Sequence, residues 1–117
     1  MKLTGLLLLT ALLAHAAPPD LQSTPPPPAA SDETKALYVR LCQACHGPDG
    51  KSPLKDLSFV DRAWKHGTKS SDMVEVISEG VPGTLMVSFR KQLTEAQILD
   101  LARYVRSLDS KLPPEKK

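Results

Sequence analysis

Two cysteines and a histidine lie within five residues of one another, in the order Cys42-Gln43-Ala44-Cys45-His46. These are the only two cysteines of the 117-residue chain. At the start of a helix, residues three apart lie nearly one turn apart, so both thiols can reach the vinyl groups on one edge of a porphyrin. The imidazole that follows then comes to lie under the iron. The pattern predicts one covalently attached haem c, with His46 as an axial ligand of its iron.

Two other uses of such a cysteine pair compete with haem attachment. A redox-active pair of the thioredoxin type is expected near a βαβ pattern, and no strand pattern is visible here. A structural zinc site needs four ligands, whereas the only other histidines are His15 and His66. Since His15 lies in a segment that we expect to be removed, haem attachment is the preferred interpretation.

Residues 1–16 are typical of a secretory signal peptide. Lys2 gives a positive start, an apolar stretch runs from Leu6 to Leu13, and Ala14-His15-Ala16 has the small-x-small form of a cleavage site. We expect cleavage after Ala16 and a periplasmic location for the mature protein. The apolar stretch is shorter than the roughly 20 residues of a normal transmembrane helix. Retention of the segment as an anchor is the alternative, and contact with a membrane is expected only in that case.

The rest of the chain divides into a linker, one folded unit and a short tail. Residues 17–30 are proline-rich, with an unbroken row from Pro25 to Pro28, and predict an extended linker, with a disordered tail left by signal cleavage as the equal alternative. Residues 31–112 are the expected domain, and residues 113–117 a charged tail. The domain is small and the chain has only two Phe, two Tyr and one Trp, so we expect the haem to complete the core. The net charge of +2, without a long block of like charge, gives no argument for nucleic-acid binding.

Three helices are predicted, and no strand pattern competes with them. The first begins near Ser31 or Asp32, runs into the cysteine motif and ends at residues 47–50. The second begins near Ser70 or Ser71 and ends at Gly80, with an apolar face formed by Met73, Val76 and Ile77.

The third predicted helix has the strongest local signals. Thr94 and Gln97 have the spacing of a capping box, and Leu93 and Ile98 that of a hydrophobic staple. Apolar residues then recur at helical spacing up to Leu108. The chain is therefore predicted to be all-α.

A second axial ligand of the iron is expected downstream of the cysteine motif. The candidates are Met73, Met86 and His66. Met73 lies on the apolar face of a predicted helix, where a role in the core is natural, and His66 lies in an expected surface loop. Met86 lies in a segment without helical or alternating period, next to the loop residues Pro82 and Gly83. Loops held by a scaffold often carry ligands, so Met86 is preferred, with core filling as its alternative.

From about Thr34 to Leu108 the chain resembles the class I c-type cytochromes, in particular the small bacterial periplasmic ones. The resemblance is carried by four segments in order: Leu37-Tyr38 before Cys42-Gln43-Ala44-Cys45-His46-Gly47, Trp64-Lys65-His66-Gly67, Gly80-Val81-Pro82-Gly83-Thr84-Leu85-Met86, and residues 93–108. It implies the class I cytochrome c fold, in which three main helices and loops surround one haem. It also implies Met86 as the distal ligand. The family often has proline directly after this methionine, where this chain has Val87.

The resemblance assigns roles to residues around the haem. It implies that the carbonyl of Pro53 accepts the N–H of the proximal histidine, which fixes the ring and makes it a better donor. It places Trp64 near the propionate edge, where its indole N–H could be donated; plain packing is the alternative. Core packing between the first and last helices is expected for Leu37, Tyr38, Leu101 and Tyr104.

These features predict an electron carrier and not an enzyme. Two axial ligands leave no position for a substrate on the iron, so transfer would be outer-sphere, during brief docking with a dehydrogenase, an oxidase or another cytochrome. A haem subunit dedicated to a dehydrogenase or oxidase complex is the first alternative. A protein that binds a small ligand or reduces peroxide is the second, and Met86 argues against it.

Overall fold

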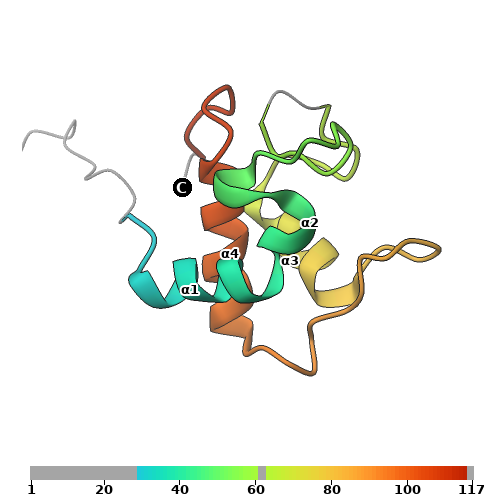
Figure 1. The fold of residues 1–117 in the computed structure, drawn as a ribbon. Helices are drawn as coiled ribbons and strands as arrows, with labels where there is room; N and C mark the ends of the chain where they lie inside the picture. The colour runs from blue at the N-terminus through green and yellow to red at the C-terminus, as the bar shows by residue number, and fades with distance from the viewer. Residues whose placement is uncertain (1–28, 61–62, 116–117) are drawn as a thin grey trace, which may run out of the picture.

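The computed structural model describes residues 29–60 and 63–115. These residues form α1 (Asp32–Leu41), α2 (Gln43–His46), a 3₁₀ turn (Pro48–Gly50), α3 (Ser70–Glu79) and α4 (Glu95–Ser107), and no strand (Figure 1). The predicted all-α class is confirmed. None of the described helices is long and apolar enough to cross a bilayer. The expected signal peptide and most of the expected linker lie outside the described residues, so these expectations stay predictions.

The helices begin where the capping signals predict. The Ser31 hydroxyl accepts the Thr34 N–H at 3.1 Å at the start of α1. At the start of α4, Gln97 donates its N–H to the Thr94 hydroxyl, and the Gln97 side chain accepts the Thr94 N–H, as in a capping box. The first helix differs from the prediction, because Cys42 has φ −120° and ψ −37° and divides it into α1 and α2.

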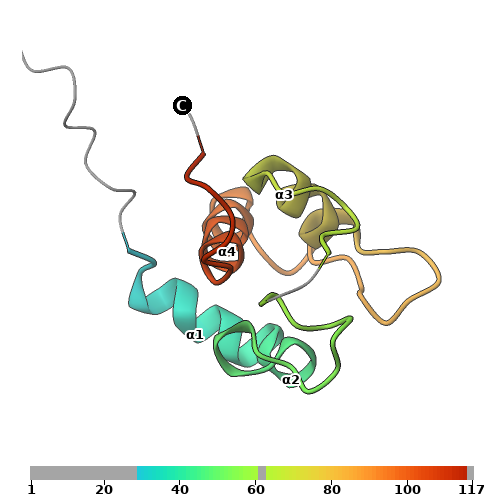
Figure 2. The same ribbon diagram turned by 90° about the horizontal axis from the view of Figure 1, so that it is seen from above.

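Helix α4 is the centre of the fold, because α1 packs against it and α3 does too. Seen from above, α1 and α3 lie on opposite sides of α4 (Figure 2). The buried apolar side chains form one core, made of Leu37, Tyr38, Phe59, Met73, Leu93, Ile98, Leu101, Ala102 and Val105. Leu93 and Ile98, the predicted staple, are both part of it, and so is Met73, as expected from its helical face.

Tyr38 is the most constrained polar side chain of this core. It is 1% exposed, and its ring meets that of Tyr104 edge to face, with 5.3 Å between the ring centroids. This confirms the expected contact between the first and last helices. The Tyr38 hydroxyl donates to the Gly47 carbonyl at 2.7 Å. Burial raises the pKa of Tyr38 from 10.0 to about 12, because the phenolate would lose its hydration.

Residues 113–115 lie against the domain. Glu115 accepts hydrogen bonds at 2.6 Å from the Ser70 N–H and the Ser70 hydroxyl, at the first turn of α3. Arg106 donates to the carbonyls of Thr68 and Pro113, and its Nε lies 3.7 Å from Glu115. Residues 113–115 thus connect α4 to the start of α3, and these contacts continue beyond the expected boundary at residue 112.

The first prediction concerns Tyr38→Phe. The substitution leaves the buried Gly47 carbonyl without its donor, so the free energy of unfolding should fall by about 1–2 kcal/mol at neutral pH. Because folding raises the pKa of Tyr38, its stabilising contribution is complete below pH 10.0 and is lost as the pH rises toward about 12. Denaturant unfolding at a series of pH values should therefore show a steeper alkaline loss for the wild type than for the variant. Parallel pH profiles would contradict this account.

The second prediction concerns Glu115→Gln. The Ser70 side chain above all, then the Ser70 N–H and two arginines, lower the pKa of Glu115 below its ordinary 4.5. Its contribution is therefore present above pH 4.5 and is lost as the pH falls through the lowered value. Since the carboxylate is partly exposed, the effect of the substitution at neutral pH should stay below about 1 kcal/mol. The difference in unfolding temperature between the wild type and Glu115→Gln should therefore be smaller in acid than at neutral pH. The control substitution Glu75→Gln, on the exposed side of α3, should change the unfolding temperature at neutral pH less than Glu115→Gln does.

Candidate haem-binding site

The cysteine motif lies at the junction of α1 and α2. Cys42 caps the end of α1, and the next four residues form the single turn of α2. The Cys42 carbonyl accepts the N–H groups of Cys45 and His46, at 3.2 and 3.0 Å. This turn presents both thiols and the imidazole from five consecutive residues, as the spacing predicts. The two thiols differ in environment, since Cys45 is exposed and Cys42 is partly buried. Burial raises the pKa of the Cys42 thiol to about 11.

Gly47 reverses the chain directly after the histidine. Its φ of +78° lies in the region that glycine adopts without strain, and a Cβ here would lie 2.0 Å from the Lys51 carbonyl oxygen. The Tyr38 hydroxyl fixes the Gly47 carbonyl from the core side. Only glycine fits this close approach, and the reversal sends residues 51–60 back across the motif.

The returning segment holds the His46 ring. Nδ1 of His46 donates to the Leu57 carbonyl at 2.7 Å, so the opposite nitrogen, Nε2, is the one suited to bind iron. The expected acceptor was the Pro53 carbonyl, and this prediction is wrong. Residues 54–57 form a turn, with the Leu57 N–H on the Leu54 carbonyl, and this turn brings Leu57 and not the exposed Pro53 to the imidazole.

Three rings, those of His46, Phe59 and Trp64, contact one another in turn. Phe59 stacks on the imidazole with 4.2 Å between centroids and an angle of 17°, and Trp64 is parallel to Phe59 at 5.7 Å. The indole N–H of Trp64 is donated to Oδ2 of Asp109 at 2.9 Å. The expected donation to a haem propionate is therefore wrong, because a protein carboxylate takes the single indole proton. Asp109 was not predicted from the sequence, since nothing local marks it as a partner of a tryptophan 45 residues away.

Met86 lies in a loop that closes on itself. The Val81 N–H donates to the Met86 carbonyl at 2.9 Å. Thr84 organises the turn between them: its hydroxyl donates to the Val81 carbonyl and accepts the Met86 N–H. Gly80 makes the closure possible, because a Cβ there would lie 2.6 Å from the Met86 carbonyl oxygen. The main chain at Met86 is thus fixed, and its side chain is partly buried.

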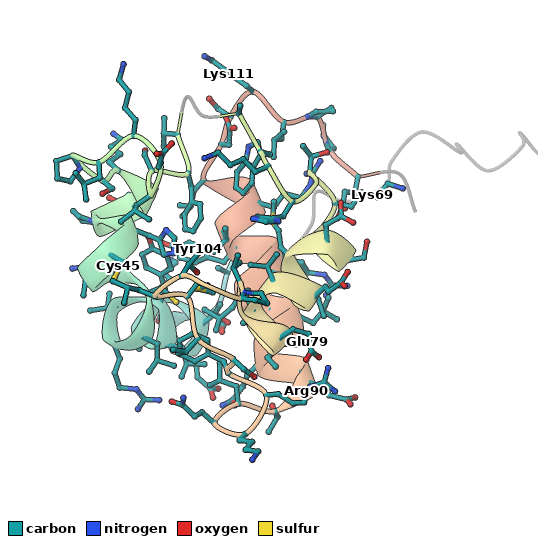
Figure 3. All side chains as sticks on the ribbon, turned by 90° about the vertical axis from the view of Figure 1, so that its right-hand side faces the viewer. Cys45, Lys69, Glu79, Arg90, Tyr104 and Lys111 are labelled. Carbon is teal, nitrogen blue, oxygen red and sulfur yellow. The ribbon has the colours of Figure 1, made fainter. Side chains whose placement is uncertain are left out.

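The base of this loop is attached to the end of α3. Phe89 donates its N–H to the Ile77 carbonyl at 3.0 Å, and the Ser88 hydroxyl donates to the Ser78 carbonyl. An ion pair between Arg90 and Glu79 lies across the same junction (Figure 3). The loop projects from the end of α3 in both ribbon views (Figures 1 and 2). Helix α3 therefore determines where Met86 lies, as α2 does for His46.

The two other candidate ligands are not part of this loop, although His66 lies beside its first residues, Gly80 to Pro82. Met73 is 5% exposed and is part of the core between α3 and α4. His66 is exposed in the segment before α3, as expected of a surface loop. Met86 remains the preferred second ligand, and this assignment stays a prediction.

The chemistry of these groups fits a haem. Two thiols and one imidazole come from a single turn, and the imidazole is oriented through Nδ1. The loop after the motif and the Met86 loop both expose large apolar side chains, among them Leu54 and Leu85, the latter 93% exposed. A macrocycle with an apolar face suits such a setting. In the described part of the chain, no three His, Cys, Asp or Glu side chains are grouped so that they could hold a metal ion.

Comparison with known proteins agrees with this chemistry. Residues 29–105 match the family model described as cytochrome c oxidase, cbb3-type, subunit III. The chain is 33% identical over 104 residues to cytochrome c55X of Paracoccus denitrificans, which covers 89% of this chain and 92% of the relative. It is 34% identical over 70 residues to the cbb3-type cytochrome c oxidase subunit CcoP of Rubrivivax gelatinosus. That match covers 58% of this chain but only 23% of the oxidase subunit.

Solved structures give the same fold. The KustC0563 c-type cytochrome is 32% identical, with a TM-score of 0.55 over 68% of this chain and 100% of the other. A chain of the Kuenenia stuttgartiensis reducing HAO-like protein complex Kustc0457/Kustc0458 has a TM-score of 0.61 at 26% identity. The match covers 74% of this chain and 47% of that one. The motif, the fold and these relatives lead to one conclusion: the chain belongs to the cytochrome c family of the cbb3-type subunit III model, and it is a small class I c-type cytochrome that binds haem c covalently.

Proposed function

We propose that this cytochrome is a periplasmic carrier of single electrons, with iron held by His46 and Met86. The observation that carries the proposal is the Met86 loop. A thioether side chain is fixed at its backbone by Thr84 and Gly80 and attached to α3, which is the rigid support that an axial ligand needs. We further propose that residues 1–16 are removed on export and that residues 17–30 are a linker to the domain.

The roles of the protein groups follow from this ligand pair. Haem c, when bound, supplies a one-electron couple at its iron. His46 and Met86 would keep both axial positions occupied, so a substrate could not bind iron without displacing one of them. A thioether ligand favours the reduced state and raises the potential relative to two imidazoles. Electrons would then pass to and from a dehydrogenase, an oxidase or another cytochrome during brief docking.

A dedicated subunit of a redox complex is the second candidate. One relative is described as an oxidase subunit, and one related structure as part of an HAO-like complex. Both are much longer than this chain, so their assembly is not transferred to it. Purification of the tagged holoprotein from periplasm separates the two candidates, since a carrier should elute alone and a subunit with stoichiometric partners.

The third prediction tests the Met86 ligand. Met86→Ala should retain the covalent haem but lose the weak red absorption band of methionine-ligated ferric haem. It should also bind cyanide faster and turn over peroxide faster, because it opens the sixth position. Absorption spectra and a peroxidase assay of purified wild type and variant measure both effects.

Met73→Leu is the matched control, since it alters a buried methionine of the core and should change neither spectrum nor turnover. Loss of the band in Met73→Leu but not in Met86→Ala would overturn the ligand assignment. Equal peroxide turnover by wild type and Met86→Ala would mean that the sixth position is already open, and a role in catalysis would then replace that of a carrier.

A further inference from the structure

The proximal side of the site is connected to the end of α4 by a buried carboxylate. Asp109 is 5% exposed and lies two residues beyond the end of α4. Its Oδ2 accepts the indole N–H of Trp64 at 2.9 Å, and its Oδ1 accepts the Lys111 N–H at 3.0 Å. A buried carboxylate without such bonds is costly, so the geometry around Asp109 is strongly specified. Neither the ligand chemistry nor the core of the fold accounts for this residue.

The His46 ring is held by one short segment on two sides. The Leu57 carbonyl accepts the Nδ1 proton at 2.7 Å, and two residues later Phe59 covers the ring face at 4.2 Å. The segment is itself attached to the motif, since Phe59 donates its N–H to the Gly50 carbonyl at 2.8 Å. Any shift of Phe59 therefore changes both the plane of the imidazole and its hydrogen bond.

Trp64 in turn packs against Phe59. The two rings are parallel within 2°, with 5.7 Å between their centroids. The indole can hold this orientation because Asp109 fixes its N–H. A continuous series of contacts thus runs from α4 through Asp109, Trp64 and Phe59 to the imidazole.

We infer that Asp109 is a positioning residue for the iron ligand: acting through Trp64 and Phe59, it fixes the His46 imidazole and its N–H···O bond, and so lowers the redox potential of the haem. The inference rests on the proposed ligation of iron by His46. A hydrogen bond to a ligating histidine makes the ring a stronger donor, and a stronger donor favours the ferric state. Loosening the support weakens that bond, so the potential rises.

The fourth prediction compares variants of this pair in the purified holoprotein. Trp64→Phe keeps a ring against Phe59 but removes the N–H donor, and Asp109→Leu removes the acceptor. Both should shift the ferric–ferrous equilibrium toward the ferrous form, by up to roughly tenfold, which is about 59 mV for one electron. The double variant should shift it no further than the larger single change, because both act through one contact. Spectroelectrochemical titration measures the potentials.

A second measurement reports the imidazole directly. In proton NMR spectra of the ferrous protein, the Nδ1 proton of His46 should exchange with solvent faster in Trp64→Phe than in the wild type. Asp100→Asn is the matched control, because it removes a carboxylate from the exposed face of α4. It should leave both potential and exchange unchanged. If Asp109→Leu does not fold, Trp64→Phe still decides the matter.

Each other outcome overturns the inference. Unchanged potential and exchange in Trp64→Phe would mean that the pair only stabilises the fold, even if the unfolding midpoint falls. A shift in Asp109→Leu without one in Trp64→Phe would mean that the carboxylate acts by its charge alone. Failure of the proposed function would instead give a wild-type absorption spectrum without the features of histidine–methionine ligation. The failure of the inference and the failure of the proposed function can therefore be told apart.

Discussion

The reversal of the chain at Gly47 is the constraint on which the site depends. Five residues supply both thiols and an imidazole, but they do not orient the imidazole by themselves. Because Gly47 adopts φ +78° with the Lys51 carbonyl against it, the next segment returns over the motif and brings the Leu57 carbonyl to His46. The Tyr38 hydroxyl holds the reversal from the core. The motif and the return of the chain therefore act together. Without the reversal at Gly47, the His46 imidazole would lack the carbonyl that accepts its Nδ1 proton.

The sequence predicts those parts of the structure that local physics determines. Helix starts follow from caps such as Thr94 with Gln97, and the inward position of Met73 follows from helical spacing. The motif of Cys42, Cys45 and His46 is local too, because its chemistry depends on one turn. The same patterns did not predict the break at Cys42, where α1 ends and α2 begins. The spacing of apolar residues is almost the same before and after such a break, so it does not show where one helix ends and the next begins.

Local sequence patterns do not predict the hydrogen-bond partners of the site residues. Pro53 was expected to face His46, but the turn over residues 54–57 selects Leu57 instead. The partner of Trp64 is 45 residues away in sequence, and no spacing rule relates two such positions. Carbonyl acceptors carry no sequence signature at all, since every residue has one. Only the packed fold decides which of them meets a given donor.

Helix α4 relates the two halves of the site. Its end supports the proximal side, through Asp109 and Trp64. Its side packs on α3, and the end of α3 holds the Met86 loop through the Phe89 N–H and the Arg90–Glu79 ion pair. Arg106, on α4 itself, donates to the Thr68 carbonyl just before α3. The segments that carry His46 and Met86 are therefore both connected to α4, the first through Trp64 and Asp109 and the second through α3. A helix is stiffer than a loop, so attachment to α4 makes the relative position of the two segments a property of the core rather than of either loop.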